Sequence, residues 1–323
     1  MKHLQKHFSA SLIALAALLA APVAASAATA PDLGAAGDFA VLSAPSGSAT
    51  GTAADGTAAA AGAVTCTNSS ITGNVGSTDP ADTVALTCTI TGGAFIAPVA
   101  TGVLSDYYSA YDALAPTLGE NCTLLDSTIP TSTTMSPGAY CTPAALTGTD
   151  VTLTLDGAGA YIFKIGTGGT GALTGTNFNV ALINGASACD VTWWVAEAAT
   201  MTTTTVPTTT TSGFKGTILA GAAITMTGTA PGTPVEGRAL AGRTSATAGV
   251  TLTDVAFVGC EGGSLGGTAR PMCNQGVGNG PENCDPGNSN QDGHSSNPFS
   301  GSPRTNDELG GTPGNPGRKG GNN

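Results

Sequence analysis

The sequence predicts an all-β fold, a β-solenoid of stacked coils with one helix packed alongside. Two matched segments near the C-terminal end indicate this, residues 214–228 (FKGTILAGAAITMTG) and residues 235–257 (VEGRALAGRTSATAGVTLTDVAF). Each begins with a short strand that carries charge and a glycine, and each then turns through small residues into a strand that alternates aliphatic residues with threonine. Two successive units of about twenty residues with one shared pattern are typical of a solenoid.

The composition agrees with many short strands and tight turns. Aromatic residues make up 5% of the chain and charged residues 10%, whereas glycine occurs 47 times.

Residues 31–260 hold fifteen acidic and four basic residues, so their net charge is 4 − 15 = −11. Because four scattered bases cannot form a basic patch, nucleic acid and anionic membrane surfaces are poor partners.

The ends of the chain differ in character from its middle. Lys2 and Lys6 precede an apolar run at residues 12–19, and Ala25-Ser26-Ala27 follows as a cleavage site. This pattern predicts a secretory signal peptide over residues 1–27, with an uncleaved anchor as the alternative. We therefore expect a secreted, extracellular protein that is periplasmic before release. Residues 28–260 are the predicted domain, and residues 261–323, rich in Gly, Asn and Pro, are predicted to be a disordered tail.

The eight cysteines of an exported chain favour disulfides over metal sites, because none of them sits in a C-x-x-C pair. Many pairings are open to eight cysteines. We predict local ones, together with one pair that closes the C-terminal coils. They are Cys66–Cys88, Cys122–Cys141 and Cys273–Cys284, with Cys189–Cys260 as the closing pair.

Strands and one helix follow from the hydrophobic spacing. Residues 99–114 place apolar and aromatic side chains on one helical face, and Pro116 ends the helix. Its tyrosines are interpreted as packing residues. Period-two or continuous apolar patterns predict strands at residues 39–43, 84–90, 151–155, 160–165, 179–183 and 191–195, and a strand and turn at residues 71–76.

Enzymatic chemistry has little support. His3 and His7 lie in the signal peptide and His294 in the tail, so the domain lacks a histidine base. Asp150 and Asp156 could form a carboxylate pair of the kind used in glycoside hydrolysis, but aspartate is also an ordinary turn residue. A calcium-like segment at 288–293 lacks the required first and last ligands. We predict no enzyme, no metal and no cofactor.

Threonine pairs in alternating strands are the candidate binding residues. Aliphatic residues between them fix which side of the strand faces the core. Outward threonine is also simply a good β-former, so the pattern has two interpretations. The run at residues 202–211 is interpreted as mostly an exposed loop, because Pro207 prevents it from being a central strand. The candidate residues are Thr152, Thr154, Thr225, Thr227, Thr251 and Thr253.

An ordered set of short motifs resembles one known family. The motifs are LGAAGDFAVL at residues 33–42, ITGNVG at 71–76, the aromatic helix, SPGAY at 136–140, LINGA at 182–186, FKGTILA at 214–220 and VEGRALA at 235–241. Their order over residues 31–260 is similar to that of the microbial ice-binding (antifreeze) proteins. Single motifs are weak, but the ordered set is specific.

The resemblance implies a discontinuous right-handed β-solenoid of triangular section with one long helix alongside. It also implies that N-terminal strands lie beside C-terminal coils, and that ice is bound through one flat face. The chain departs from the family pattern at residues 47–63 and 202–212, which look like insertions that could shield or extend that face.

The predicted function is therefore a secreted ice-binding protein. Its flat threonine-rich face would adsorb to ice crystals and inhibit their growth or recrystallisation. We expect a monomer whose partners are the ice surface and ordered water. Charged residues at 215, 236 and 238 disfavour the other strands as the binding face. The alternatives are an extracellular carbohydrate-binding module that uses Trp193, Trp194 and the tyrosines, or an adhesin stalk, which would need a longer array of coils.

Overall fold

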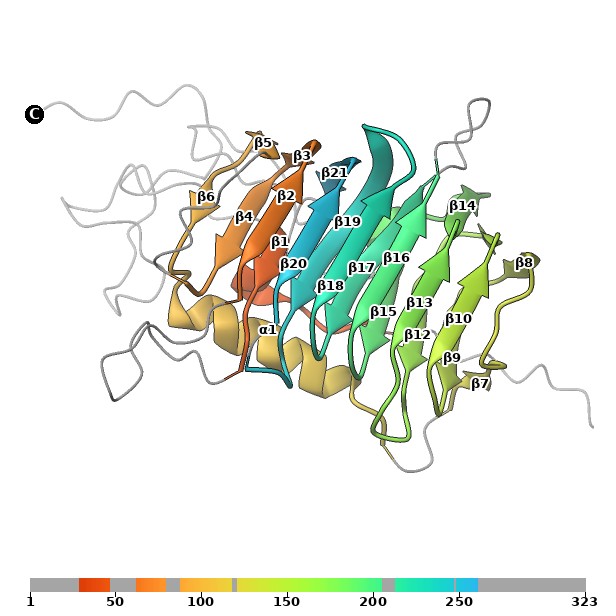
Figure 1. The fold of residues 1–323 in the computed structure, drawn as a ribbon. Helices are drawn as coiled ribbons and strands as arrows, with labels where there is room; N and C mark the ends of the chain where they lie inside the picture. The colour runs from red at the N-terminus through yellow and green to blue at the C-terminus, as the bar shows by residue number, and fades with distance from the viewer. Residues whose placement is uncertain are drawn as a thin grey trace, which may run out of the picture.

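A computed structural model describes residues 29–46, 62–79, 88–117, 121–204, 213–246 and 248–260. It shows parallel strands stacked coil upon coil, with one helix along the stack (Figure 1). The expected signal peptide, the expected tail and the Cys273–Cys284 pair lie outside the described residues. Within those ranges, no helix is both long and apolar enough to cross a membrane.

The strands form three parallel sheets. The largest has twelve strands, in the order β5 (Cys88–Thr91), β3 (Ser69–Thr72), β21 (Val255–Gly259), β19 (Thr233–Ala241), β17 (Phe214–Ala220), β15 (Val191–Val195), β12 (Tyr161–Ile165), β9 (Gly138–Thr142) and β7 (Thr123–Leu124), with β1 (Phe39–Ser43), β4 (Asn74–Ser77) and β6 (Phe95–Ile96) branching from β19. The second has six strands, β10 (Leu146–Thr149), β13 (Leu173–Thr176), β16 (Ala199–Thr203), β18 (Ile224–Gly228), β20 (Val250–Thr253) and β2 (Val64–Thr67). The third has three strands, β14 (Asn179–Ile183), β11 (Thr152–Asp156) and β8 (Ser132–Met135).

The coils are triangular. The consecutive strands β10, β11 and β12 belong to three different sheets, and so do β13, β14 and β15. Each of these coils therefore contributes one strand to each side of the stack, and every strand pairs with its equivalent in the next coil. The predicted all-β solenoid with one helix is confirmed.

The chain order of the stack is discontinuous. N-terminal strands pair with the last coils: β1 with β19, β2 with β20 and β3 with β21. Three predicted disulfides are confirmed, Cys66–Cys88, Cys122–Cys141 and Cys189–Cys260. The first of them joins β2 to β5, and the last joins the segment before β15 to the residue after β21.

The helix α1 (Thr101–Leu114) lies along the twelve-stranded sheet, close to the 3-10 turn η1 (Gly34–Asp38). Its buried side includes Tyr107, whose hydroxyl donates to the carbonyl of Ala220 at 2.7 Å. Burial raises the pKa of the Tyr107 hydroxyl. Arg243 pairs with Asp112 at 2.7 Å and fixes the exposed side of the helix. The helix ends before Pro116, as predicted, and its tyrosines are packing residues.

Two hydrophobic clusters stabilise the stack. One fills the solenoid, where Phe163 and Trp193 stack with ring centroids 4.1 Å apart. The other lies between the outer side of the large sheet and α1, and it includes Trp194 and Leu219. Burying a side chain of this size contributes about 1.5–3 kcal/mol, so the interior holds the coils rigidly in register.

Candidate functional site

The six-stranded sheet carries two threonines on the outer side of every strand. In each strand the pair is separated by one inward-facing residue, so both hydroxyl-bearing side chains face the same way. The pairs are Thr147/Thr149, Thr174/Thr176, Thr200/Thr202, Thr225/Thr227, Thr251/Thr253 and Thr65/Thr67. We call these twelve residues the threonine face.

The twelve residues form two rows because the strands pair in register. Thr225 lies opposite Thr200 on one side and Thr251 on the other, and Thr251 lies opposite Thr65. Thr147 lies opposite Thr174 at the other end of the sheet. Neighbours along a row are therefore about 4.7–4.9 Å apart, and the two rows are about 6.6 Å apart, two residues along a strand. The result is a regular grid of methyl and hydroxyl groups.

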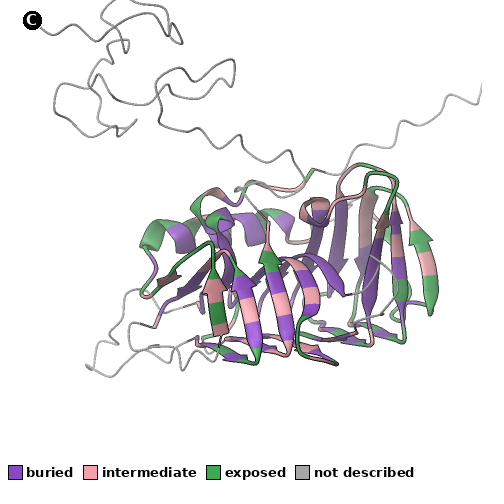
Figure 2. Cartoon of the chain, turned by 90° about the horizontal axis from the view of Figure 1, so that it is seen from above, coloured by how far each residue is buried: buried purple, intermediate pink, exposed green. Residues whose placement is uncertain are grey.

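Burial alternates along each strand and fixes the threonines outward. Bands of buried and less buried residues alternate along the strands in Figure 2. Leu252, which lies between Thr251 and Thr253, is fully buried, and the residues between the other pairs are also buried. A one-residue slip would bury the threonines and expose the aliphatic side chains. Core packing, and not the threonines themselves, therefore sets the register of the grid.

Two inward positions are glycines for a steric reason. A Cβ atom at Gly148 would lie 2.8 Å from the ring of Phe178, and one at Gly175 would lie 2.7 Å from the Cβ of Phe178. Phe178 fills the core beneath these strands, so a side chain at either glycine would push the sheet outward. The glycines keep this end of the threonine face level with the rest.

None of the six strands contains a charged or aromatic residue. Acids occur only at the rim, where Asp150 and Asp254 follow strands β10 and β20 in the left-handed region, with φ of 53° and 57°. Asn177 holds the equivalent corner of the next coil, and its amide donates to Asp150 at 2.7 Å. These are turn roles, because short polar side chains tolerate this conformation.

Small residues border the opposite side of the grid. Two positions before the first threonine of each strand stand Ala145, Ala172, Ala198, Ala223, Gly249 and Ala63. Parallel hydrogen bonds continue through this row, for example from the amide of Leu173 to the carbonyl of Ala198. Gly249 has no methyl, because a Cβ there would lie 2.7 Å from the carbonyl oxygen of Ala63. No bulky side chain from this row overhangs the threonines.

The first row gains one more residue at the β10 end. Thr128 forms an isolated parallel bridge with Thr147, and their hydroxyl oxygens lie 3.3 Å apart. Thr128 is exposed, so it continues the row by one step beyond the sheet.

The structure brings four predicted residues together and separates two. Thr225, Thr227, Thr251 and Thr253 are direct neighbours in β18 and β20. The expectation that Thr152 and Thr154 continue their rows is wrong. Strand β11, which carries them, pairs with β8 and β14 in the three-stranded sheet, and that sheet lies around a corner of the coil.

Sequence reasoning missed the other eight residues of the threonine face. The tetrapeptide LTGT occurs at residues 146–149 and again at 173–176, and VTCT at residues 64–67 has the same alternation. These repeated segments are the sequence signal that could have identified the missed residues of the threonine face. The run at residues 202–211 begins within a strand, because Thr202 and Thr203 belong to β16. The part of the run from residue 205 onward, where the loop was predicted, lies outside the described residues.

The two tryptophans, both within the described residues, offer no platform for a sugar. Trp193 and Trp194 are both buried, with 0% and 4% of their surfaces exposed. The indole nitrogen of Trp194 donates to the carbonyl of Tyr111 at 3.0 Å, so this ring is held beneath the helix. The carbohydrate-binding alternative thereby loses the tryptophans on which it depended.

The comparisons with known proteins agree with this architecture. The family model described as Ice-binding-like matches residues 36–256. No curated protein matches the chain. Family and structural neighbours are described by binding to ice and not by a reaction, in accord with the prediction that the chain is no enzyme.

Several solved structures share the fold. An ice-binding protein from an Antarctic biological consortium is 25% identical, with a TM-score of 0.51, and the match covers 74% of this chain and 95% of that one. An ice-binding protein from the Antarctic ascomycete Antarctomyces psychrotrophicus is 24% identical, with a TM-score of 0.52 and coverage of 74% and 100%. The DUF3494 domain of Shewanella frigidimarina ice-binding protein 1 is 24% identical, with a TM-score of 0.52 and coverage of 73% and 100%.

Proposed function

Because the chain belongs to the Ice-binding-like family, we propose that it adsorbs to ice crystals through the threonine face and inhibits their growth or recrystallisation. The observation that carries this proposal is the register of the six strands, which sets the first threonine of each pair opposite the first threonine of the next strand throughout the sheet. Ice is itself a repeating lattice, so a grid of equal spacing meets it at many equivalent points.

Each threonine supplies two kinds of contact. The methyl group orders the water beside it, and the hydroxyl holds a water molecule by donating or accepting a hydrogen bond. Along a row the spacing of about 4.7–4.9 Å is close to oxygen spacings on ice planes. The face is therefore suited to holding an ice-like water layer that merges with the crystal.

The weak contacts between single threonines and ice add up only if the threonine face is rigid before it meets the crystal. Ordering one flexible residue costs about 1–2 kcal/mol, which would cancel the gain from a single threonine contact. Here the backbone of every threonine is already held in a parallel ladder above a packed core. The ordering cost is met during folding, so the contacts with ice act together.

The absence of charge from the six strands supports the same proposal. Charged groups bind water in orientations that suit liquid hydration, and removing that water is costly unless the charge finds a partner. Ice offers no counter-ion. The chain in this proposal is secreted and acts as a monomer, and its partner is the ice surface with its ordered water.

A pair of double variants tests the proposal. Thr227→Tyr with Thr251→Tyr places two rings in the centre of the threonine face, whereas Thr152→Tyr with Thr154→Tyr makes the same change on the three-stranded sheet. We expect the first variant to lose most thermal hysteresis and retention in growing ice, and the second to keep both. The melting temperature of each protein shows that it is folded.

Full activity in the folded first variant would overturn the choice of face. Loss in the second variant alone would assign adsorption to the three-stranded sheet. If the unmodified protein shows neither thermal hysteresis nor retention in ice, the proposed function itself fails.

A further inference from the structure

One row of inward side chains crosses the twelve-stranded sheet close to its corner with the six-stranded sheet. The strands pair in register along this row, and all its members are buried. The middle of the row is apolar and consists of Ile165, Val195, Ala220 and Ala241. The two ends carry hydroxyl groups instead, with Thr142 at one end and Ser43 and Ser77 at the other.

The two serines donate to carbonyls that precede strands of the threonine face. The hydroxyl of Ser43 donates to the carbonyl of Ala248 at 2.9 Å, and the hydroxyl of Ser77 donates to the carbonyl of Gly62 at 2.9 Å. Ala248 lies two residues before β20, and Gly62 lies two residues before β2. Each buried hydrogen bond therefore connects the twelve-stranded sheet to the beginning of a threonine-bearing strand.

The middle coils use backbone amides at the same place. The carbonyl of Glu197, two residues before β16, accepts from the amide of Ala222 at 3.0 Å. Residues 196–198 join β15 to β16 there, whereas residues 44–63 join β1 to β2 and residues 242–249 join β19 to β20. The serine hydroxyls are therefore found where the connections between the two sheets are long.

Thr142, at the other end of the row, has a replaceable role. Its hydroxyl donates to the carbonyl of Ala144 at 3.3 Å, but that carbonyl also accepts from the amide of Gly166 at 3.1 Å. Within the described residues, the carbonyls of Ala248 and Gly62 have no such second partner. Because a buried carbonyl without a partner is costly, the serines are needed at their end of the row.

The two segments that the serines hold are in contact with each other. A Cβ atom at Gly62 would collide with the hydroxyl of Ser43 and with the carbonyl of Ala248. Beside them, the amide of Val250 donates to the carbonyl of Ala63 at 3.0 Å and joins β20 to β2. The hydroxyls thus fix the beginnings of two adjacent strands, which carry four of the twelve residues of the threonine face.

We propose that Ser43 and Ser77 are positioning residues for adsorption to ice, because they hold β20 and β2 in the plane of the threonine face. The inference rests on the proposed function. In the described sheet β2 is an edge strand that pairs with β20 alone (Figure 1). Its plane therefore depends on that pairing, on the Cys66–Cys88 disulfide and on the segment that leads into it. A threonine that must first be ordered by the crystal contributes less to adsorption.

A variant with Ser43→Ala and Ser77→Ala tests the inference. Its melting temperature should fall by about 4–8 °C, because two buried carbonyls lose their partners. In the cold, where the variant is folded, exchange of the Val250 amide with solvent should be about tenfold faster. Thermal hysteresis should fall by roughly one third, because the threonines of two strands would have to be ordered on contact with ice.

Tyr161→Phe is the matched control. Tyr161 is buried, and its hydroxyl donates to the carbonyl of Gly157 at 2.8 Å, beside the three-stranded sheet. Its loss should lower the melting temperature and leave thermal hysteresis and exchange at Val250 unchanged. The amide of Leu173, which donates to the carbonyl of Ala198, reports on a distant part of the six-stranded sheet, and its exchange should be unchanged in the serine variant.

The measurements separate this inference from the proposed function. If the serine variant melts lower but matches Tyr161→Phe in thermal hysteresis and in exchange at Val250, the serines serve general stability and the inference is wrong. If the double variant does not fold, the single variant Ser77→Ala decides by the same measurements. If the unmodified protein shows no thermal hysteresis, the proposed function fails, and the role of the serines in adsorption fails with it.

Discussion

Two regions of this solenoid are built by the same strand pairing and differ in what they present outward. In the six-stranded sheet every outward position of the two rows is threonine. In the twelve-stranded sheet one outward row reads Lys215, Glu236, Val258, Thr72 and Thr91, also in register. Regular stacking is therefore common to both, but only one region repeats the same chemistry from coil to coil.

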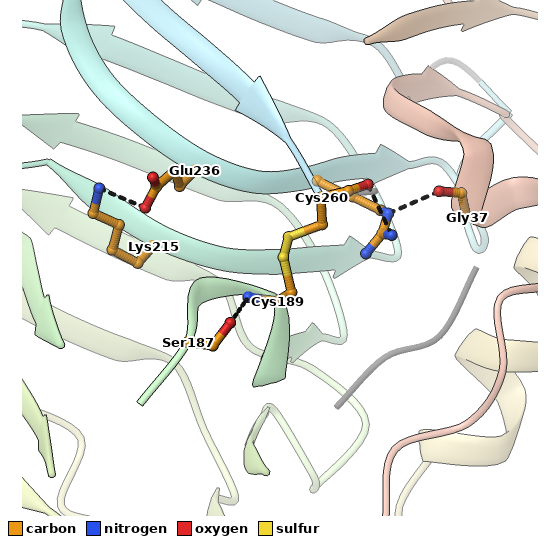
Figure 3. The surroundings of a disulfide bond; sticks show 7 residues. Gly37, Ser187, Cys189, Lys215, Glu236 and Cys260 are labelled. Atoms are coloured by element: carbon orange, nitrogen blue, oxygen red, sulfur yellow. Dashed lines mark hydrogen bonds and ion pairs between the residues drawn. A yellow bond between two sulfur atoms is a disulfide. The ribbon is translucent and has the colours of Figure 1, made fainter. Parts of the chain in front are cut away.

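The charged pair explains why the second row is unsuited to ice. Lys215 and Glu236 form an ion pair at 2.8 Å beside the Cys189–Cys260 disulfide (Figure 3). A partly exposed pair contributes little stability but keeps a shell of strongly bound water. Periodic backbone spacing alone does not make an ice-like surface, because the side chains on it must also be uniform and uncharged.

A charge placed on the threonine face should reduce ice binding more than any other change considered, because it removes the chemical difference between the two sheets. Thr225→Asp places a carboxylate in the middle of the first row, where adsorption would leave it without a partner. We expect the equilibrium constant for adsorption to ice to fall by about tenfold, a loss of ~1.4 kcal/mol, and thermal hysteresis to fall with it. Thr72→Asp makes the same change on the other row, and equal losses in both variants would contradict the assignment.

A bulky residue beside the grid should have a smaller effect. Ala223→Tyr raises a ring next to Thr225 and tilts a flat crystal away from that edge. We expect the equilibrium constant for adsorption to fall about threefold, a loss of ~0.7 kcal/mol, with a correspondingly smaller loss of thermal hysteresis. The control is Ala113→Tyr, at an exposed position of α1. Unchanged activity in Ala223→Tyr would confine the contact to the threonines themselves.

A disulfide holds β2, the strand that carries the last pair of threonines at one edge of the threonine face. Cys66 lies between Thr65 and Thr67 in the edge strand β2, and Cys88 holds it in place. Replacing both cysteines by alanine should cost about 3 kcal/mol and lower the melting temperature by roughly 6–12 °C. Thermal hysteresis in the cold, where the protein stays folded, should fall less than twofold.

The matched control for this change is the Cys122–Cys141 pair, which closes a loop of similar length but joins the residue before β7 to β9, outside the six-stranded sheet. Its removal should lower the melting temperature by a similar amount and leave thermal hysteresis unchanged. If the Cys66/Cys88 and Cys122/Cys141 double variants lose thermal hysteresis equally, the position of the edge strand β2 is not important for ice binding.

The smallest expected effect is that of pH. Threonine has no titratable group, so the threonine face keeps the same donors and acceptors throughout the working range. Thermal hysteresis measured between about pH 5 and pH 9 should stay constant. A change of severalfold within this range would show that charged residues outside the grid take part in adsorption.

Local pattern predicted much of this molecule. The spacing of apolar residues predicted the helix and many strands. Short separations along the chain predicted two of the disulfides that the structure contains, and the third, Cys189–Cys260, was predicted as the pair that closes the C-terminal coils. The same reasoning misplaced Thr152 and Thr154. The segment VTLT at residues 151–154 is identical to VTLT at residues 250–253, yet the two belong to different sheets. Alternation says which side of a strand faces outward, but not which side of the triangle the strand forms.

The sequence by itself determined that the chain forms strands with aliphatic residues inward and threonines outward, because that alternation is a property of each strand alone. Only the tertiary structure decided which threonines share a plane. Asp150 turns the chain away from the grid before Thr152, and β2 joins the grid from a distant part of the chain by pairing with β20. The pairing of strands between coils decides which sheet each strand joins, and the alternation within a single strand does not specify that pairing.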